Sequence, residues 1–166
     1  MLRIVMEEEE LANDRKVKKN AISFKSSNGT DIVAGYYYTC PGMEPRCILQ
    51  ISHGMCEYIG RYDDFAGYMA QKGYVVCGND HLGHGATSSG PNGTDGYFAE
   101  KDGRKFVLQD LHEMNRLARE AYPGLPVILL GHSMGSFLRG CMPSCIRKRC
   151  MHWCSAARAV LTRWRA

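Results

Sequence analysis

The sequence has no long apolar stretch, and no run in it approaches the roughly eighteen residues that a membrane-spanning helix needs. Internal repeats and low-complexity segments are also missing, and 45% of the residues are apolar, which is typical of a globular protein. The charged segment 1–20 is not followed by the apolar stretch of a secretory signal. We therefore expect a cytoplasmic protein without a transmembrane segment, in which 1–20 is a solvated arm.

Acidic residues are missing from one part of the chain. The segment 139–166 contains no Asp or Glu but seven Lys or Arg, whereas 1–138 carries 14 basic and 17 acidic residues, a net charge of −3. Four of the eight cysteines and both tryptophans also fall in 139–166. A break this sharp after Leu138 indicates that the tail and the body of the chain have different origins.

The body alternates between strand and helix patterns. Apolar runs and alternation predict strands over 21–26, 32–40, 47–52, 74–77 and 125–130. Helical spacing predicts helices over 62–72, with Phe65, Tyr68 and Met69 on one face, and over 104–121. The buried stripe expected for the second helix is Phe106, Leu108, Leu111, Met114, Leu117 and Ala118. The first two strands should form a hairpin and the others a mainly parallel sheet flanked by helices, which is an α/β fold.

The pentapeptide Gly131–Gly135 fits the pattern Gly-x-Ser-x-Gly and directly follows an apolar strand. This pattern places a serine nucleophile on a sharp strand-to-helix turn, with its oxygen exposed at the carboxyl end of the sheet. The glycines let backbone segments pass where a side chain would clash. We therefore predict that Ser133 is a catalytic nucleophile; the alternative is a chance glycine turn.

Acyl transfer also needs amide donors for the oxyanion that forms on the substrate. The turn aims the amide of Met134 at that position. The loop after the strand 47–52 offers the amide of Met55 as the second donor, although His53-Gly54 in the same loop also fits an ordinary turn that ends a strand.

Three histidines, His53, His81 and His84, raise the question of a metal site. Their spacing matches no common set of metal ligands. We expect them to hydrogen-bond loop carbonyls instead, and we expect neither a metal nor a cofactor.

Four segments carry a family resemblance: His53–Glu57, Gly60–Tyr62, Asp80–Gly85 and Gly131–Gly135. They resemble, in order and spacing, the monoacylglycerol lipase, lysophospholipase and serine aminopeptidase group of α/β-hydrolases. The resemblance covers about 20–138, the N-terminal part of that fold.

The resemblance implies Ser133 as the nucleophile and the Met55 and Met134 amides as the oxyanion hole. It implies hydrolysis of an acyl ester or lipid such as a monoacylglycerol or lysophospholipid, with peripheral lipid contact in intact members. A peptidase or another acyl hydrolase of the same fold is the alternative. Tyr58 stands where the group usually has His, and Leu82 where it often has Arg, which loosens the substrate assignment.

The rest of the catalytic triad is missing from the sequence. In this fold the triad follows the chain order Ser, then Asp or Glu, then His. No acidic residue follows Ser133, and the only later histidine, His152, comes too early to be the base. We therefore expect no carboxylate–histidine pair beside Ser133 and little activity from these 166 residues, because a serine without a base is a weak nucleophile.

The tail has two interpretations. The first is a metal or nucleic-acid module. Its closely spaced cysteines are compatible with a zinc site: Cys141, Cys145, Cys150 and Cys154, with His152. The gap between the second and third cysteines is short for a zinc finger, and the basic charge of the tail is compatible with nucleic-acid binding. The preferred hypothesis is a frameshift. If one base was lost after Leu138, synonymous codons allow the tail to be read as ARLYAVLHTEALHALVLCGTSGANPVAG, which resembles a family helix followed by the strand LVLCGTSG.

The chain thus divides into an arm 1–20, the N-terminal part of an α/β-hydrolase domain over 21–138, and a basic, Cys-rich, out-of-frame tail over 139–166. Under the frameshift hypothesis we expect no nucleic-acid partner. The helix that follows Ser133 can extend into the tail, but beyond it the tail has no helical or strand period. It should therefore pack poorly and leave the edge of the strand 125–130 uncovered.

Overall fold

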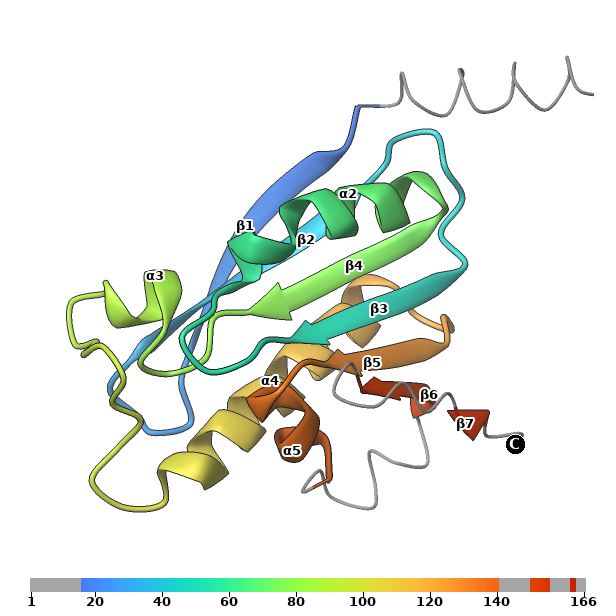
Figure 1. Cartoon of the computed structure of the whole chain (residues 1–166). Helices are drawn as coiled ribbons and strands as arrows, with labels where there is room; N and C mark the ends of the chain where they lie inside the picture. Colours follow the sequence, from blue (N-terminus) through green and yellow to red (C-terminus); the bar gives the residue numbers. More distant parts are fainter. Residues whose placement is uncertain (1–15, 141–149, 156–161, 164–166) are drawn as a thin grey trace, which may run out of the picture.

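The computed structural model describes residues 16–140, 150–155 and 162–163, with side chains over 16–138. The strands in this part form one mixed sheet in the order β1-β2-β4-β3-β5-β6-β7 (Figure 1). Helices lie on both faces of the sheet, so the chain has the expected α/β fold. No helix in the described part is both long and apolar enough to cross a membrane.

The sheet begins with the predicted hairpin. β1 (Lys18–Lys25) and β2 (Ile32–Thr39) are antiparallel, with Ile22 opposite Gly35. The assignment of 1–20 to a solvated arm is wrong for Lys18–Asn20, which pair with β2, while 1–15 lie outside the described residues. These two lysines and one asparagine can join a strand because β1 is at the edge of the sheet, where their side chains stay exposed.

The centre of the sheet is parallel. β3 (Cys47–Ser52) lies between β4 (Tyr74–Asn79) and β5 (Val127–Gly131), and all six of its residues are buried. β3 has the predicted bounds, and β4 is two residues longer than predicted. Ser52 pairs with Gly131 in the register, so the loops that follow β3 and β5 leave the sheet side by side.

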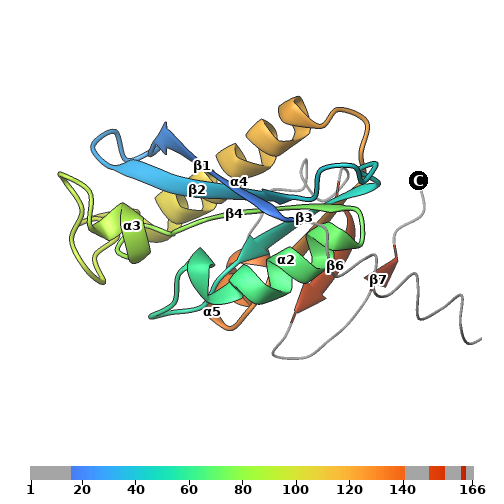
Figure 2. The same ribbon diagram turned by 90° about the horizontal axis from the view of Figure 1, so that it is seen from above.

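Two apolar cores lie on opposite faces of this sheet, because neighbouring residues of a strand point to opposite sides. Ile48 and Val75 belong to the core that α4 (Gly103–Ala121) covers. The next residues, Leu49 and Val76, belong to the core under α2 (Asp63–Gln71). Figure 2 shows the sheet nearly edge-on, with α4 on one side and α2 on the other.

α2 packs on the sheet through small residues rather than through its aromatic ones. Ala66 and Ala70 are buried, whereas Phe65 and Tyr68 are 41% and 57% exposed. The shared face of Phe65, Tyr68 and Met69 is therefore not the buried face, and only Met69 packs against the core. Small side chains let the helix approach the strands closely, an effect that hydrophobic periodicity does not capture.

α4 buries much of its predicted stripe, including Leu111, Met114 and Ala118, and also two polar residues that the pattern did not predict. The carboxylate of Asp110 accepts hydrogen bonds from Ser26 Oγ at 2.7 Å and Ser27 N at 2.8 Å. The amide of Asn115 donates to Gln50 Oε1 of β3 at 2.7 Å. These partners make the burial of polar groups tolerable, and they join α4 to the hairpin and to the central strand.

Two short elements lie in the loops at the carboxyl end of the sheet. η1 (Ile59–Tyr62) follows β3, and α3 (Gly85–Ser88) follows β4. The segment 80–96 is otherwise free of regular structure, as expected for its Gly, Ser and Asn content.

The tail contributes strands to the sheet, contrary to expectation. After α5 (Met134–Gly140), the backbone of β6 (Cys150–Ser155) pairs in parallel with β5, and β7 (Thr162–Arg163) pairs with β6. The prediction that the edge of β5 is uncovered is therefore wrong. An unpaired edge offers its N–H and C=O groups to any nearby chain, and this pairing needs no side-chain periodicity. The zinc hypothesis concerns cysteine side chains that lie outside those described.

Candidate active site

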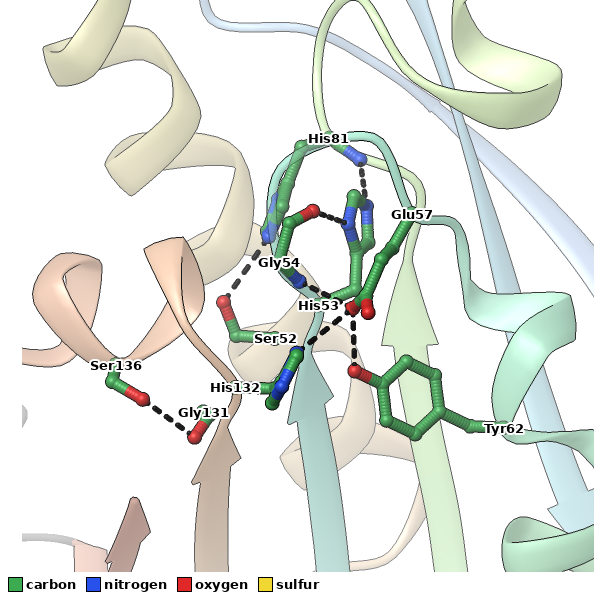
Figure 3. Close-up of polar contacts among 9 residues, drawn as sticks. All are labelled: Ser52, His53, Gly54, Glu57, Tyr62, His81, Gly131, His132 and Ser136. Carbon is green, nitrogen blue, oxygen red and sulfur yellow. Dashed lines mark hydrogen bonds and ion pairs between the residues drawn. The ribbon is translucent and has the colours of Figure 1, made fainter. Parts of the chain in front are cut away.

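Ser133 lies on a sharp turn between β5 and α5, as the pentapeptide predicts. Its φ of 47° is left-handed, which for a residue other than glycine is a strained conformation costing on the order of 1–3 kcal/mol. Two hydrogen bonds hold the turn. Gly135 N donates to His132 O at 2.8 Å. Ser136 Oγ donates to Gly131 O at 2.7 Å (Figure 3). The turn leaves Ser133 exposed to a substrate.

Both glycines of the pentapeptide are required by close backbone contacts. A Cβ on Gly131 would lie 2.6 Å from Gly135 O, and a Cβ on Gly135 would lie 2.0 Å from Ser52 O. The same Ser52 O accepts a hydrogen bond from His132 N at 3.0 Å. The turn therefore packs directly on the end of β3, and it fits there only because Gly131 and Gly135 have no side chains.

The loop after β3 lies directly against Ser133. A Cβ placed on Gly54 would be 3.2 Å from Ser133 Cβ and 3.0 Å from His132 Nδ1. Met55 follows Gly54, and Met134 follows Ser133, so both predicted amide donors belong to segments that meet here. Within the part of the chain that the structure describes, neither amide donates to a backbone oxygen. Both amides are thus available to a ligand, as an oxyanion hole requires.

The carboxylate of Glu57 ties the two loops together. Its Oε2 accepts hydrogen bonds from Gly54 N at 2.8 Å and Tyr62 OH at 2.7 Å, and lies 3.1 Å from His132 Nδ1 (Figure 3). Partial burial alone would raise the pKa of Glu57, but the hydrogen bonds from Tyr62, Gly54 and His132 outweigh it and lower the pKa to about 2. Glu57 is therefore a carboxylate at neutral pH.

The Glu57–His132 contact corrects one expectation. A carboxylate–histidine pair does lie beside Ser133, since His132 is its neighbour in the chain. Sequence reasoning missed it because Glu57 and His132 are 75 residues apart. However, no histidine among the described residues is hydrogen-bonded to Ser133, so the pair does not have the geometry of a triad.

His53 and His84 bond to loop carbonyls, as predicted. The Nδ1 atoms of His53 and His84 lie 2.8 Å from Gly54 O and Leu82 O respectively, and His53 Nε2 accepts from His81 N at 3.0 Å. The ring of His81 bonds differently, with Nε2 3.1 Å from Ser52 Oγ. Among the described residues, no group of three or more His, Cys, Asp or Glu is placed to hold a metal ion. His53 thus supports the loop that carries Met55 and joins it to the loop that follows β4, whereas the hydrogen bond of His84 lies within that second loop.

Asp80 fixes the second loop that borders the site. Its buried carboxylate accepts hydrogen bonds from Ile59 N at 2.8 Å and Ala86 N at 2.9 Å. Gly85 passes so close that a Cβ there would lie 2.3 Å from Asp80 Oδ2. The motif Asp80–Gly85 therefore positions η1 and α3 rather than supplying a reactive group.

The buried histidines make the fold sensitive to acid. Burial lowers the pKa of His53 from 6.5 to about 4, and it lowers the pKa of His81 well below its usual value. Between about pH 6.5 and pH 4, His53 binds a proton in the unfolded chain but not in the folded protein, so the free energy of unfolding falls as the pH falls. We expect the free energy of unfolding to drop by about 2 kcal/mol for His53 alone between about pH 7 and pH 5.

Urea unfolding at the two pH values measures this effect. His53→Gln should remove a large part of the pH dependence, while His112→Gln, at an exposed position on α4, should retain it. An unfolding free energy that is the same at both pH values in the unsubstituted protein would contradict the prediction.

Comparison with known proteins places the chain among hydrolases of this architecture. A family model described as "Serine aminopeptidase, S33" matches residues 43–140, more than half of the chain. The match ends two residues beyond Leu138, where the composition changes.

Similar proteins agree with the family match. The chain is 36% identical over 105 residues to the monoglyceride lipase of Rattus norvegicus and 37% identical over 106 residues to a monoglyceride lipase homolog of monkeypox virus. These alignments cover 61% and 60% of the chain but only 32% and 33% of the relatives, so the chain spans about a third of their length. A thermostable carboxyl esterase from Bacillus coagulans superposes with a TM-score of 0.72 at 30% identity, covering 82% of the chain and 43% of the esterase.

Proposed function

The chain belongs to the serine aminopeptidase S33 family of α/β-hydrolases, and we propose that it is the N-terminal part, with the nucleophile, of an ester hydrolase acting on monoacylglycerol-like or lysophospholipid-like substrates. The observation that carries this proposal is the exposed Ser133 on its strained turn, beside the loop of Gly54 and Met55. The names of the relatives favour a monoacylglycerol, and an intact protein of this kind would contact lipid peripherally. A cytoplasmic location stays a prediction from the sequence.

Ser133 Oγ would attack the ester carbonyl carbon and form a tetrahedral intermediate. The N–H groups of Met55 and Met134 would stabilise its oxyanion by donating hydrogen bonds to it, from positions that are already set before the reaction. A histidine base would take the Ser133 proton during the attack and give it to the leaving oxygen, so that collapse of the intermediate expels the alcohol and leaves an acyl group on Ser133. Water, activated by the same base, would then remove the acyl group. Glu57 would hold the two amide-bearing loops at the spacing that this chemistry needs, because it bonds to Gly54 and His132.

The general base is not among these residues. In this fold a carboxylate and then a histidine follow the nucleophile, and 134–166 contain no Asp or Glu. We propose that 139–166 are read out of frame and that the in-frame continuation supplies both groups. Two observations support this: the composition changes at Leu138, and the family match stops at Gly140.

A substrate panel on the protein with the reading frame restored tests the proposed substrate class. We expect a monoacylglycerol and a lysophospholipid to be hydrolysed at least about 100-fold faster than an amino-acid anilide, because an amide is the less reactive carbonyl and its amine needs a well-placed acid to leave. Ser133→Ala is the control for background hydrolysis. Faster cleavage of the anilide would instead establish a peptidase, the second candidate, which the description of the family model favours.

A further inference from the structure

A cavity lies apart from the residues of the proposed ester chemistry. It has a volume of about 450 Å³ and lies between the β1–β2 turn and the loop that follows α3. Asn92 Nδ2 of the loop donates to Thr30 O of the turn at 2.9 Å, which joins the two walls; in Figure 1 both segments lie at the carboxyl end of β4. Pockets of about 300–1,000 Å³ are typical of small-molecule sites. None of Ser133, Met55 and Met134 lines this cavity.

The cavity is rich in hydrogen-bond acceptors and negatively charged. Asp31 and Glu100 line it, and none of the described lining residues is Lys, Arg or His; Lys101 follows Glu100 in the chain but is not in the lining. Asp31 Oδ2 already accepts from Asn28 Nδ2 at 2.6 Å and Thr30 Oγ1 at 3.1 Å. Within the described residues, Asp31 Oδ1 and the Glu100 carboxylate accept no hydrogen bond. A ligand that fits these groups carries N–H donors and a positive charge.

Aromatic rings form the rest of the wall. Phe98 and Phe106 are partly buried against the core of α4, and Tyr97 is 52% exposed. The faces of aromatic rings attract cations and also accept apolar chains. A divalent cation fits this lining less well, because only two carboxylates line the cavity and no group of three or more His, Cys, Asp or Glu among the described residues is placed to hold a metal ion.

We propose that this cavity binds a primary alkylammonium ion. The ammonium group donates to the carboxylates of Asp31 and Glu100, and the alkyl chain lies against Phe98 and Phe106. An anion is repelled by the two carboxylates, and a neutral alcohol of the same size lacks the charge that they select.

Titration with n-butylammonium chloride, followed by amide NMR, tests this site in the 166-residue chain. We expect saturable shifts confined to the turn around Asp31 and to 94–106, with a Kd on the order of 1 mM, a value typical of so small a ligand. Glu100→Gln should weaken binding about tenfold. Glu44→Gln, an exposed carboxylate beyond the lining, should leave the Kd unchanged, and 1-butanol at the same concentrations should give no saturable shift.

Three outcomes would overturn the proposal: no saturation by about 50 mM n-butylammonium, equal affinity for 1-butanol, or an unchanged Kd in Glu100→Gln. Glu100 is exposed and makes no hydrogen bond with a described residue. Glu100→Gln should therefore keep the urea midpoint of the unsubstituted protein, so a weaker Kd can be assigned to the lost charge. Calcium chloride in place of the amine should leave the spectrum unchanged. Saturable shifts with calcium would be a fourth contradicting outcome, because they would make the cavity a metal site rather than an amine site.

Discussion

A protein of these 166 residues is expected to hydrolyse a short-chain chromogenic ester at no more than about 10³–10⁴ times the rate in water, the level that remains in serine hydrolases without a triad. The two proposed oxyanion donors and Ser133 belong to these residues, and Ser133 is exposed, but no histidine among the described residues is hydrogen-bonded to Ser133 and so placed to take its proton. An unactivated serine hydroxyl is a weak nucleophile at neutral pH. The reaction should therefore lose most of its rate enhancement while the turn itself stays intact.

The assay compares the 166-residue protein with its Ser133→Ala and His132→Ala variants. Turnover at an ordinary enzymatic rate that disappears in Ser133→Ala would show that a base exists. If it disappeared in His132→Ala as well, His132 would be that base, since it is next to Ser133 in the chain and its Nδ1 lies 3.1 Å from Glu57 Oε2.

Gly135→Ala should destabilise the fold by about 3–5 kcal/mol, at the upper end of single substitutions. The added Cβ would lie 2.0 Å from Ser52 O and 2.7 Å from Ser52 Oγ, and the first of these is a backbone atom of the central strand. β3 cannot move away, because β4 and β5 are hydrogen-bonded to its two sides. A loss of this size is a large share of the about 5–15 kcal/mol that stabilises a typical domain.

Gly67→Ala is the matched control for this substitution. A Cβ at Gly67, inside α2, would meet only Val17 Cγ2 at 4.0 Å. Alanine also favours a helix over glycine by about 1 kcal/mol, so this variant should be as stable as the parent or slightly more stable. Urea unfolding of both variants measures the difference, and equal unfolding free energies would contradict the close packing of the turn on β3.

The turn around Ser133 could be predicted from the sequence because its signature is local. An apolar strand followed by two glycines and a serine at fixed spacing indicates this turn, although the contact of Gly135 with Ser52 also depends on β3. The bounds of β3 were predictable for a similar reason, since a short apolar run between polar segments has one natural strand assignment. The loop roles of His53 and His84 followed from the absence of metal-ligand spacing.

Other features depend on contacts between distant segments. The bridge from Glu57 to His132 joins residues that only the parallel register of β3 and β5 brings together. The buried face of α2 depends on how closely the helix approaches the strands, which favours Ala66 and Ala70 over Phe65. The pairing of β6 with β5 depends on backbone groups, so the irregular side-chain pattern of 150–155 could not predict it.

The proposed role of Ser133 is tested most directly by kcat/KM for a short-chain ester, measured with the reading frame restored after Leu138, in the protein and in its Ser133→Ala variant. We expect ordinary enzymatic turnover that falls by at least about 10⁴-fold when Ser133 is replaced. Equal kcat/KM values in the two proteins would contradict the claim that Ser133 is the nucleophile of an ester hydrolase.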